Sequence, residues 1–571
     1  MVMNLVACGV PANTYDEFGE TPGIALLLGG PNETGLVVDL AKRLLPEPDI
    51  PLVSERALYR KDIKHLKLIL EDSVIAEASG CGPLSLAARA GDERLVRELI
   101  KKYPQSLKEV NDFEDTPLHL AIKHPSCLRL ILEAGGSLML EQLEAEAWDW
   151  TPLACACRLG CRASAQILLA TGSRINEFCI IHGHESCLDD VLAALKQRRD
   201  EIKLLALEHL TQAEAKGFGL HEEKVLDGCA LEVQRLLLER GVHVPPRLCD
   251  GLYYPVYFLA YSTPLFDKLW ALGFRDVNSC NKFGDMPLTR YRFDVEKARW
   301  LIEHGADYWT PFYERSSSTD ISNITATPAH FLCCRVGLPY QLYGEHSDEY
   351  YKRVKTSQWL VEKLIQVQVT DACSCPCFGG GCTPLKGFFD QLRDYRNLTN
   401  IQDLARWCVG LTRTFLASFG EEDLITALRR MTFDGLGLTH TCCNLWNDIQ
   451  RYHESFYTLE EVEEINSEQR PLLTLFNNLL VEFDQVAHED QDGLPLIVHD
   501  PEEFWVHRWL PRMEETLDGL NGDDITAEER SAAEAVGVKW DLQPLKEVEE
   551  EEEEDWTPEY VMERLKKILD E

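Results

Sequence analysis

Apolar residues recur along the first third of the chain in a pattern typical of short, paired helices. In one pair, Leu118, Ala121 and Ile122 form a stripe along a first helix. In the preceding pair, apolar positions in the segment LVRELI, residues 95–100, mark a second helix. In the following pair, Gly172 comes directly after the second helix and supplies a left-handed turn that ends it. The pattern predicts successive helix pairs packed against one another.

The helix pairs begin at a motif that returns at a nearly constant interval. The segment TPLHLA, residues 116–121, has counterparts at Pro83 and at Pro152, and the three prolines are 34 and 35 residues apart. Thr116 can cap a helix through its hydroxyl, and Pro117 fits the first helical position because no amide donor is needed there. This motif and a period of about 33 residues are typical of ankyrin repeats.

On these residues the chain resembles an ankyrin-repeat protein, and more specifically the large ankyrin-repeat proteins of filamentous fungi. The segments RRDEIKLLALEHL and MTFDGLGLTHTCC also resemble that group. The resemblance covers roughly residues 1–390 as repeats of differing clarity. It implies an all-α fold: an irregular, interrupted ankyrin-repeat solenoid of about seven or eight units, followed by a C-terminal helical region.

Several units depart from the regular pattern. Downstream starts are expected at Pro287, Pro328 and Pro384, whose spacings of 41 and 56 residues imply insertions. Glu114 and Asp149 replace the turn glycine, although a positive φ costs more in a residue that has a Cβ. We therefore expect distorted units within a periodic array.

The composition shifts divide the chain into five expected segments. Amphipathic helices rich in charge interrupt the array, aromatic residues mark a non-repeat helical region, and an acidic run follows it. The segments are ankyrin repeats at 1–180, a helical insertion at 181–250, divergent ankyrin repeats with a cysteine-rich loop at 251–390, a C-terminal helical region at 391–520, and an acidic tail with a terminal helix at 521–571.

The charge and the cysteine content limit which partners the protein is expected to bind and in which cellular compartment it is expected. The 95 acidic and 57 basic residues give a net charge of −38, which disfavours binding to nucleic acid and to anionic membrane surfaces. No apolar stretch approaches the roughly 20 residues of a membrane span, and the N-terminus does not resemble a secretory signal. The 20 cysteines are then expected to be thiols in a reducing compartment, the cytoplasm, with the nucleus not excluded.

The cysteine-rich loop is the strongest chemical signal. Four thiols within ten residues, followed later by a second sulfur-rich patch, could supply a structural zinc site, because thiolates and imidazole suit Zn²⁺. The alternative is a loop of ordinary thiols or of small buried residues. The candidate ligands are Cys373, Cys375, Cys377, Cys382, His440, Cys442 and Cys443.

A second group of potential ligands lies at the end of the third clear repeat. Cys179, His182, His184 and Cys187 are spaced as C-x₂-H-x-H-x₂-C. Because a repeat hairpin loop is expected here, solvated histidines are the stronger interpretation.

Aromatic residues at the expected turn tips are candidate protein-binding anchors. Trp148 and Trp150 flank Asp149, and Phe113 and Phe283 occupy the comparable turn position in their own repeats. Exposed tryptophans often dominate the energy of protein interfaces. The alternative, weighed equally for the two tryptophans, is that they pack on the adjacent repeat.

These observations favour a protein-interaction scaffold or adaptor over an enzyme. The sequence contains no nucleophile elbow, phosphate-binding loop, kinase motif set or H-E-x-x-H motif, so no catalytic residue is assigned. Two alternatives remain: an enzyme with its active site in the C-terminal helical region near Cys382 and His440, and a zinc-stabilised structural module. The expected partners are proteins whose identity the sequence does not specify.

Overall fold

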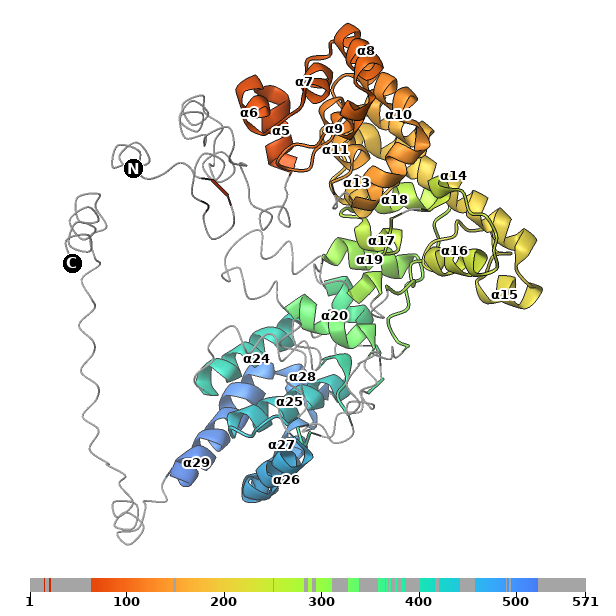
Figure 1. Cartoon of the computed structure of the whole chain (residues 1–571). Helices are drawn as coiled ribbons and strands as arrows, with labels where there is room; N and C mark the ends of the chain where they lie inside the picture. Colours follow the sequence, from red (N-terminus) through yellow and green to blue (C-terminus); the bar gives the residue numbers. More distant parts are fainter. Residues whose placement is uncertain are drawn as a thin grey trace, which may run out of the picture. The chain divides into compact units, whose positions relative to one another are not determined.

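In the computed structural model, the described parts of the chain are mostly helical (Figure 1). The chain divides into two compact units, and Lys61–Glu515 contains nearly all of the described helices. No described helix is long and apolar enough to cross a bilayer. The described residues are 15, 20–21, 63–146, 150–249, 251–281, 286–289, 294–310, 327–337, 358–364, 366–367, 369–370, 375–377, 381–385, 401–415, 421–441, 458–488, 490–491 and 494–521.

Short helices that start at the predicted motif pack side by side as an inner row. Proline occupies the first helical position in five of them, and Asn176 caps a sixth by accepting a hydrogen bond from the Cys179 amide. A pair of helices, α5 (Ile63–Glu71) and α6 (Ser73–Ala78), precedes the row. The row comprises α7 (Pro83–Ala90), α9 (Pro117–Leu120), α11 (Pro152–Arg158), α13 (Glu177–Ile181), α17 (Val256–Leu259), η3 (Pro287–Thr289) and α20 (Pro328–Gly337).

Longer helices form a matching outer row, and each contacts its predecessor in that row. These successive contacts confirm an all-α ankyrin solenoid, in which every unit is stabilised by its neighbours. The outer helices are α8 (Glu93–Lys102), α10 (Pro125–Glu146), α12 (Arg162–Thr171), α14 (Glu185–His209), α18 (Thr263–Leu272) and α19 (Val295–Glu303).

The turns between helices use left-handed backbone, as the sequence predicts. Gly91, Gly172 and Gly273 end helices with φ values of 70°, 93° and 99°. Glu114, where glycine was expected, has a φ of 60° and is the non-glycine residue with positive φ among the described residues. The backbone geometry of the repeat is therefore kept at this turn despite its cost for a residue with a side chain.

A buried histidine connects one unit to the next at two places in the array. The Thr116 amide donates to His119 Nδ1 at 3.1 Å, and His119 Nε2 contacts the Trp150 carbonyl at 3.1 Å. The Thr327 amide likewise donates to His330 Nδ1 at 3.2 Å, and His330 Nε2 contacts the carbonyl of Cys382 at 2.8 Å. The same bridge therefore recurs in the divergent part of the array.

This bridge places Cys382 in the repeat itself. Trp150 directly precedes the repeat start at Thr151, and Cys382 directly precedes the start at Thr383. Residues 384 and 385 are helical, as a new unit requires. The unit that starts at Pro384 therefore follows the unit of His330 despite the long spacing between them.

The helical insertion grows out of an outer helix. The N-terminal part of α14 packs on α12, and its C-terminal part packs on α16 (Ala230–Glu239) and η2 (Pro246–Leu248) (Figure 1). Ile202, Val233 and Leu237 belong to a separate apolar core in this segment, which α15 (Gln212–Gly217) completes. The Gly251 amide then donates to the Ile175 carbonyl, so the chain returns to the array beside the point where it left.

The C-terminal helical region has an aromatic core. Trp505 and Trp509 are fully buried, as are Phe433 and Phe476, and Trp509 Nε1 donates to Thr432 Oγ1 at 3.0 Å. A two-stranded antiparallel hairpin, β1 (Asp490–Gln491) and β2 (Leu494–Pro495), interrupts the helices. The helical elements are α24 (Ile401–Phe415), α25 (Glu421–Gly435), α26 (Leu459–Glu468), α27 (Arg470–Ala487), α28 (Leu496–His499), η5 (Glu503–Trp509), which is a π-helix, and α29 (Leu510–Asn521).

Candidate functional site

The turn-tip aromatics predicted as anchors are packed inside the array where they are described. Phe113 is buried and stacks on the His65 ring, with ring centroids 4.7 Å apart. Trp150 is 8% exposed and packs edge-on against Phe178 of the next unit, at 4.8 Å between centroids. For Trp150 the packing alternative therefore describes the side chain, and both residues offer little area to a partner. Trp148 and Phe283 lie outside the described residues.

Other aromatic residues of the repeats are exposed, and the sequence reasoning missed them. Tyr253 directly precedes the turn into α17 and is 61% exposed, while Trp309 follows α19 and is 52% exposed. Tyr261, between α17 and α18, is also exposed. Trp309 comes two residues after the Gly-Ala-Asp segment that ends an ankyrin unit, so its position in the repeat was the available signal.

A cavity of about 200 Å³ with both apolar and polar lining lies beside the units that flank the insertion. It is bounded by α17, by η3 and by residues of α18 and α19. Asp294 and Lys297 add charge to its lining, and exposed Tyr261 forms part of it. The apolar lining residues include Ile181, Tyr257, Phe266, Leu288 and Leu301.

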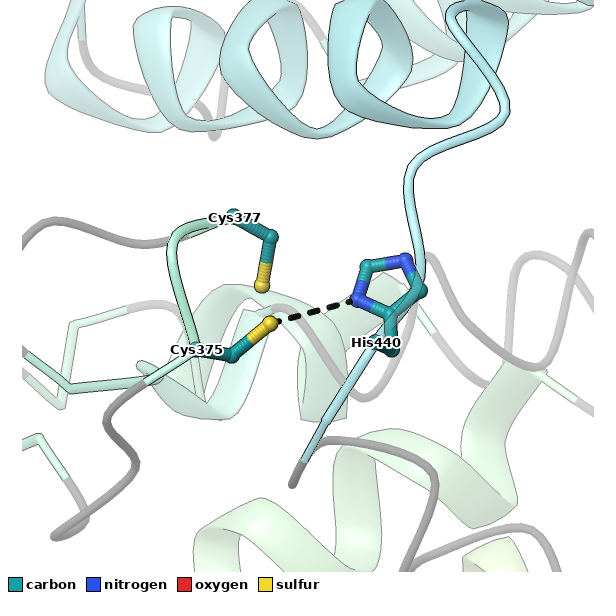
Figure 2. Close-up of side chains that lie close together, drawn as sticks. All are labelled: Cys375, Cys377 and His440. Carbon is teal, nitrogen blue, oxygen red and sulfur yellow. Dashed lines mark hydrogen bonds between the residues drawn. The ribbon is translucent and has the colours of Figure 1, made fainter. Parts of the chain in front are cut away.

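Three of the predicted metal ligands meet in a buried cluster (Figure 2). Cys375 and Cys377 come from a short loop before the last repeat start, and His440 follows the C-terminal end of α25. Their potential ligand atoms all lie within 4.8 Å of one another, and Cys375 Sγ is 3.7 Å from His440 Nδ1. The sequence neighbours Cys373, Cys442 and Cys443 lie outside the described residues.

Cys382 is not one of the three clustered residues, although the sequence analysis grouped it with the other thiols. Its carbonyl accepts the hydrogen bond from His330, and its side chain is buried at a repeat start. The group of three clustered residues within the described part of the chain does not include it. The repeat periodicity, rather than metal chemistry, accounts for its position.

Charged residues of α25 hold the imidazole of the cluster in place. Asp434 Oδ1 lies 2.8 Å from His440 Nε2, and Asp434 Oδ2 lies 2.9 Å from Arg430 Nε. Arg430 Nη1 is 3.0 Å from His440 Nδ1. A carboxylate at Nε2 fixes the tautomer in which Nδ1 carries a lone pair. The sequence reasoning missed both residues, although their spacing of four on a helix predicts an ion pair.

A second arginine faces the cysteine loop. Arg429 Nε donates to the Cys377 carbonyl at 2.9 Å, and Nη2 donates to the Pro376 carbonyl at 2.7 Å. Burial lowers the pKa of Arg429, and the two nearby thiols Cys377 and Cys375 oppose that effect. A cation beside both thiols favours their thiolate forms.

The second predicted ligand group is divided between different roles. His182 stacks on Trp150, and His184 Nδ1 accepts from the Ser186 amide at the start of α14. Cys179 and Cys187 are buried, and their thiols donate to Asn176 Oδ1 and to the Ala156 carbonyl. The two histidines therefore act in packing and capping, in keeping with the non-metal interpretation.

Comparison with known proteins agrees with the repeat geometry. The family model described as ankyrin repeats (3 copies) matches residues 55–142 and 84–179. Residues 55–179 are ankyrin repeats. A solved structure similar to this chain is titled "Crystal structure of the ankyrin repeat domain of Bcl-3: a unique member of the IkappaB protein family". It shares 18% identity over 55% of this chain and 99% of its own, with a TM-score of 0.21. No curated protein matches this chain.

The matched ankyrin repeats contain the three repeat starts at Pro83, Pro117 and Pro152 and the first histidine bridge. They extend from before α5 to α13, so they include His119 and the buried aromatics Phe113 and Trp150. The exposed residues Tyr253, Tyr261 and Trp309, the cavity and the cysteine–histidine cluster all follow the matched ankyrin repeats in the chain.

Proposed function

We propose that this protein is a scaffold or adaptor that binds other proteins on its ankyrin array. The observation that carries the proposal is the cavity between successive units, which is lined by both apolar and charged residues and to which exposed Tyr261 contributes. Tyr261 lines the cavity, and we propose that the exposed side chains of Tyr253 and Trp309 lie on the same side of the array; we call the cavity and these three residues the aromatic face. Ankyrin arrays are suited to this role because stacked units form an extended binding surface.

The chemistry of the aromatic face favours a partner with an apolar side chain and basic flanks. Tyrosine and tryptophan supply large contact areas at low entropic cost, and they are enriched among the residues that dominate interface energies. The cavity of about 200 Å³ has room for an inserted apolar side chain. The net charge of −38 steers basic partners toward the protein and repels acidic ones.

The thiol chemistry supports a reducing compartment, and we propose the cytoplasm or the nucleus. Cys81, Cys127 and Cys408 are buried as thiols rather than as disulfides. Burial raises the pKa of each of these thiols, which keeps them protonated and unreactive.

The proposal is tested by affinity purification from the source cells with the full chain and matched variants. Trp309→Ala and Tyr261→Ala remove exposed aromatic area from the face, whereas Val481→Ala removes exposed apolar area from α27. We expect Trp309→Ala to lower the affinity for a recovered partner by at least about tenfold in a direct titration. The reason is that interface anchors contribute about 2 kcal/mol or more. Equal affinities of all three variants and the unaltered chain would refute binding at this face.

The rival interpretation of an enzyme near the cysteine cluster receives less support. Cys375, His440 and Asp434 form a chain of contacts that resembles an activated nucleophile. However, the Cys375 side chain is 0% exposed, and a nucleophile has to be reached by its substrate. Hydrolysis of a broad substrate panel that disappears in Cys375→Ala and persists in Cys382→Ala would favour the enzyme instead.

A further inference from the structure

We infer that Cys375, Cys377 and His440 bind a zinc ion that connects the last part of the ankyrin array to the C-terminal helical region. The three residues come from segments 65 positions apart, yet their ligand atoms converge within 4.8 Å. All three side chains are buried. Buried sulfur and imidazole ligands of this kind are typical of structural zinc sites.

The spacing of the ligand atoms fits a single tetrahedral ion. With zinc–sulfur and zinc–nitrogen bonds of about 2.3 and 2.0–2.1 Å, a thiolate and an imidazole bound to one ion lie about 3.6 Å apart. Cys375 Sγ and His440 Nδ1 are 3.7 Å apart. These two groups therefore already have the separation that coordination requires, and Cys377 lies within 4.8 Å of both.

The surroundings of the histidine prepare it for coordination through Nδ1. The contact of His440 Nε2 with Asp434 places the proton on Nε2, which is how carboxylates orient metal-binding histidines. Arg430 Nη1 lies 3.0 Å from the same Nδ1, so the ion displaces this contact. Arg430 keeps its ion pair with Asp434, and the Asp434 carboxylate offsets the positive charge of the Arg430 guanidinium.

Charge balance at the site follows from the ligand chemistry. When Zn²⁺ binds, Cys375 and Cys377 each lose one proton to solvent and bind as thiolates, while His440 binds as the neutral imidazole. The two thiolates neutralise the charge of the ion. Arg429, whose guanidinium binds the carbonyls of the cysteine loop, adds a positive charge that favours the thiolates as they form on zinc binding. The fourth tetrahedral position is not assigned by these three residues.

The first test is metal binding by the full chain purified under reducing conditions. We expect about one zinc per chain by elemental analysis. After chelation, titration with Co²⁺ should give a sulfur-to-cobalt charge-transfer band in the near ultraviolet. Calorimetry with zinc in buffers of different ionisation enthalpy should report release of about two protons per ion near neutral pH. Folded protein that binds neither zinc nor cobalt at the stoichiometric level overturns the inference.

The second test uses variants within the same cysteine-rich segment. Cys375→Ser and His440→Ala should each lower zinc affinity by at least about tenfold, because each removes one ligand. Cys382→Ser is the matched control, since Cys382 is also a buried thiol but belongs to the repeat, and it should bind zinc normally. Loss of binding in Cys382→Ser equal to that in Cys375→Ser contradicts the ligand set.

Folding is monitored by far-ultraviolet circular dichroism so that loss of a ligand is separated from loss of structure. If a ligand variant does not fold, the cobalt band and the proton count of the unaltered chain decide the question. Coordination by the two thiols is overturned if the cobalt-loaded protein shows no sulfur-to-cobalt charge-transfer band. It is also overturned if zinc binding releases no protons.

Discussion

Replacing His119 with alanine tests whether the histidine bridge holds neighbouring ankyrin units together. His119 is buried at the start of α9, accepts from the Thr116 amide and contacts the Trp150 carbonyl through Nε2. In His119→Ala the amide and the carbonyl lose this partner. The change therefore acts within one unit and between two units at once.

The magnitude follows from the groups that lose their hydrogen bonds. A net hydrogen bond contributes about 1 kcal/mol, and a buried polar group left without a partner costs about 1–3 kcal/mol. Removing the imidazole also leaves a cavity among buried neighbours, which adds to the loss. We expect the free energy of unfolding to fall by about 3 kcal/mol, most of it from the unpaired amide and carbonyl.

Urea unfolding followed by circular dichroism measures the total loss, and hydrogen exchange locates it. Protection should fall at the amides of α9 and α11 and be kept in the C-terminal helices. His209→Ala, which removes an exposed imidazole, should change stability by no more than about 0.5 kcal/mol. His330→Ala, at the second bridge, should act like His119→Ala. A loss below about 1 kcal/mol in His119→Ala would show that the bridge contributes little.

Three further substitutions probe the turns and one surface ion pair. Glu114→Gly should stabilise the chain by about 1 kcal/mol in thermal unfolding, because its φ of 60° suits glycine, and Glu114→Ala should bring no such gain. Gly91→Ala should destabilise the chain by more than about 1 kcal/mol, because φ is 70° and the new Cβ would lie 2.5 Å from the His124 ring. Unchanged stability of this variant would contradict the explanation. Hydrogen bonding to Arg162 lowers the pKa of Asp190, so Asp190→Asn should cost about 0.5 kcal/mol at neutral pH. That difference should disappear as the pH falls through the lowered pKa, below about 4, and a difference independent of pH would refute the ion-pair explanation.

The periodic part of the fold could be predicted from the sequence because its determinants are local. A proline at the first helical position and a turn glycine act within a few residues, so the starts of α7, α9 and α11 agree with the predicted motif. The start at Pro384 could also be predicted, because the motif survives the long spacing before it. Units of a solenoid need only their neighbours, so a local pattern is enough to identify them.

The rest depends on contacts between distant residues, which a single sequence does not show. Phe113 was expected at a turn tip, but whether a turn aromatic is exposed depends on the neighbouring unit, here the His65 ring. The convergence of Cys375 with His440 could be guessed only from their residue types, and the separation of Cys382 from them only from the repeat bridge. Arg430 and Asp434 give no signal of their own beyond an ordinary helical ion pair.

The single helix α14 belongs to two cores, since Val191 and Leu192 are buried in its repeat half and Ile202 and Ala206 in its insertion half. A continuous helix has no hinge at the boundary between them, so the two cores are mechanically coupled. Force applied to the insertion is transmitted along the helix axis to the array instead of being absorbed by a flexible connection.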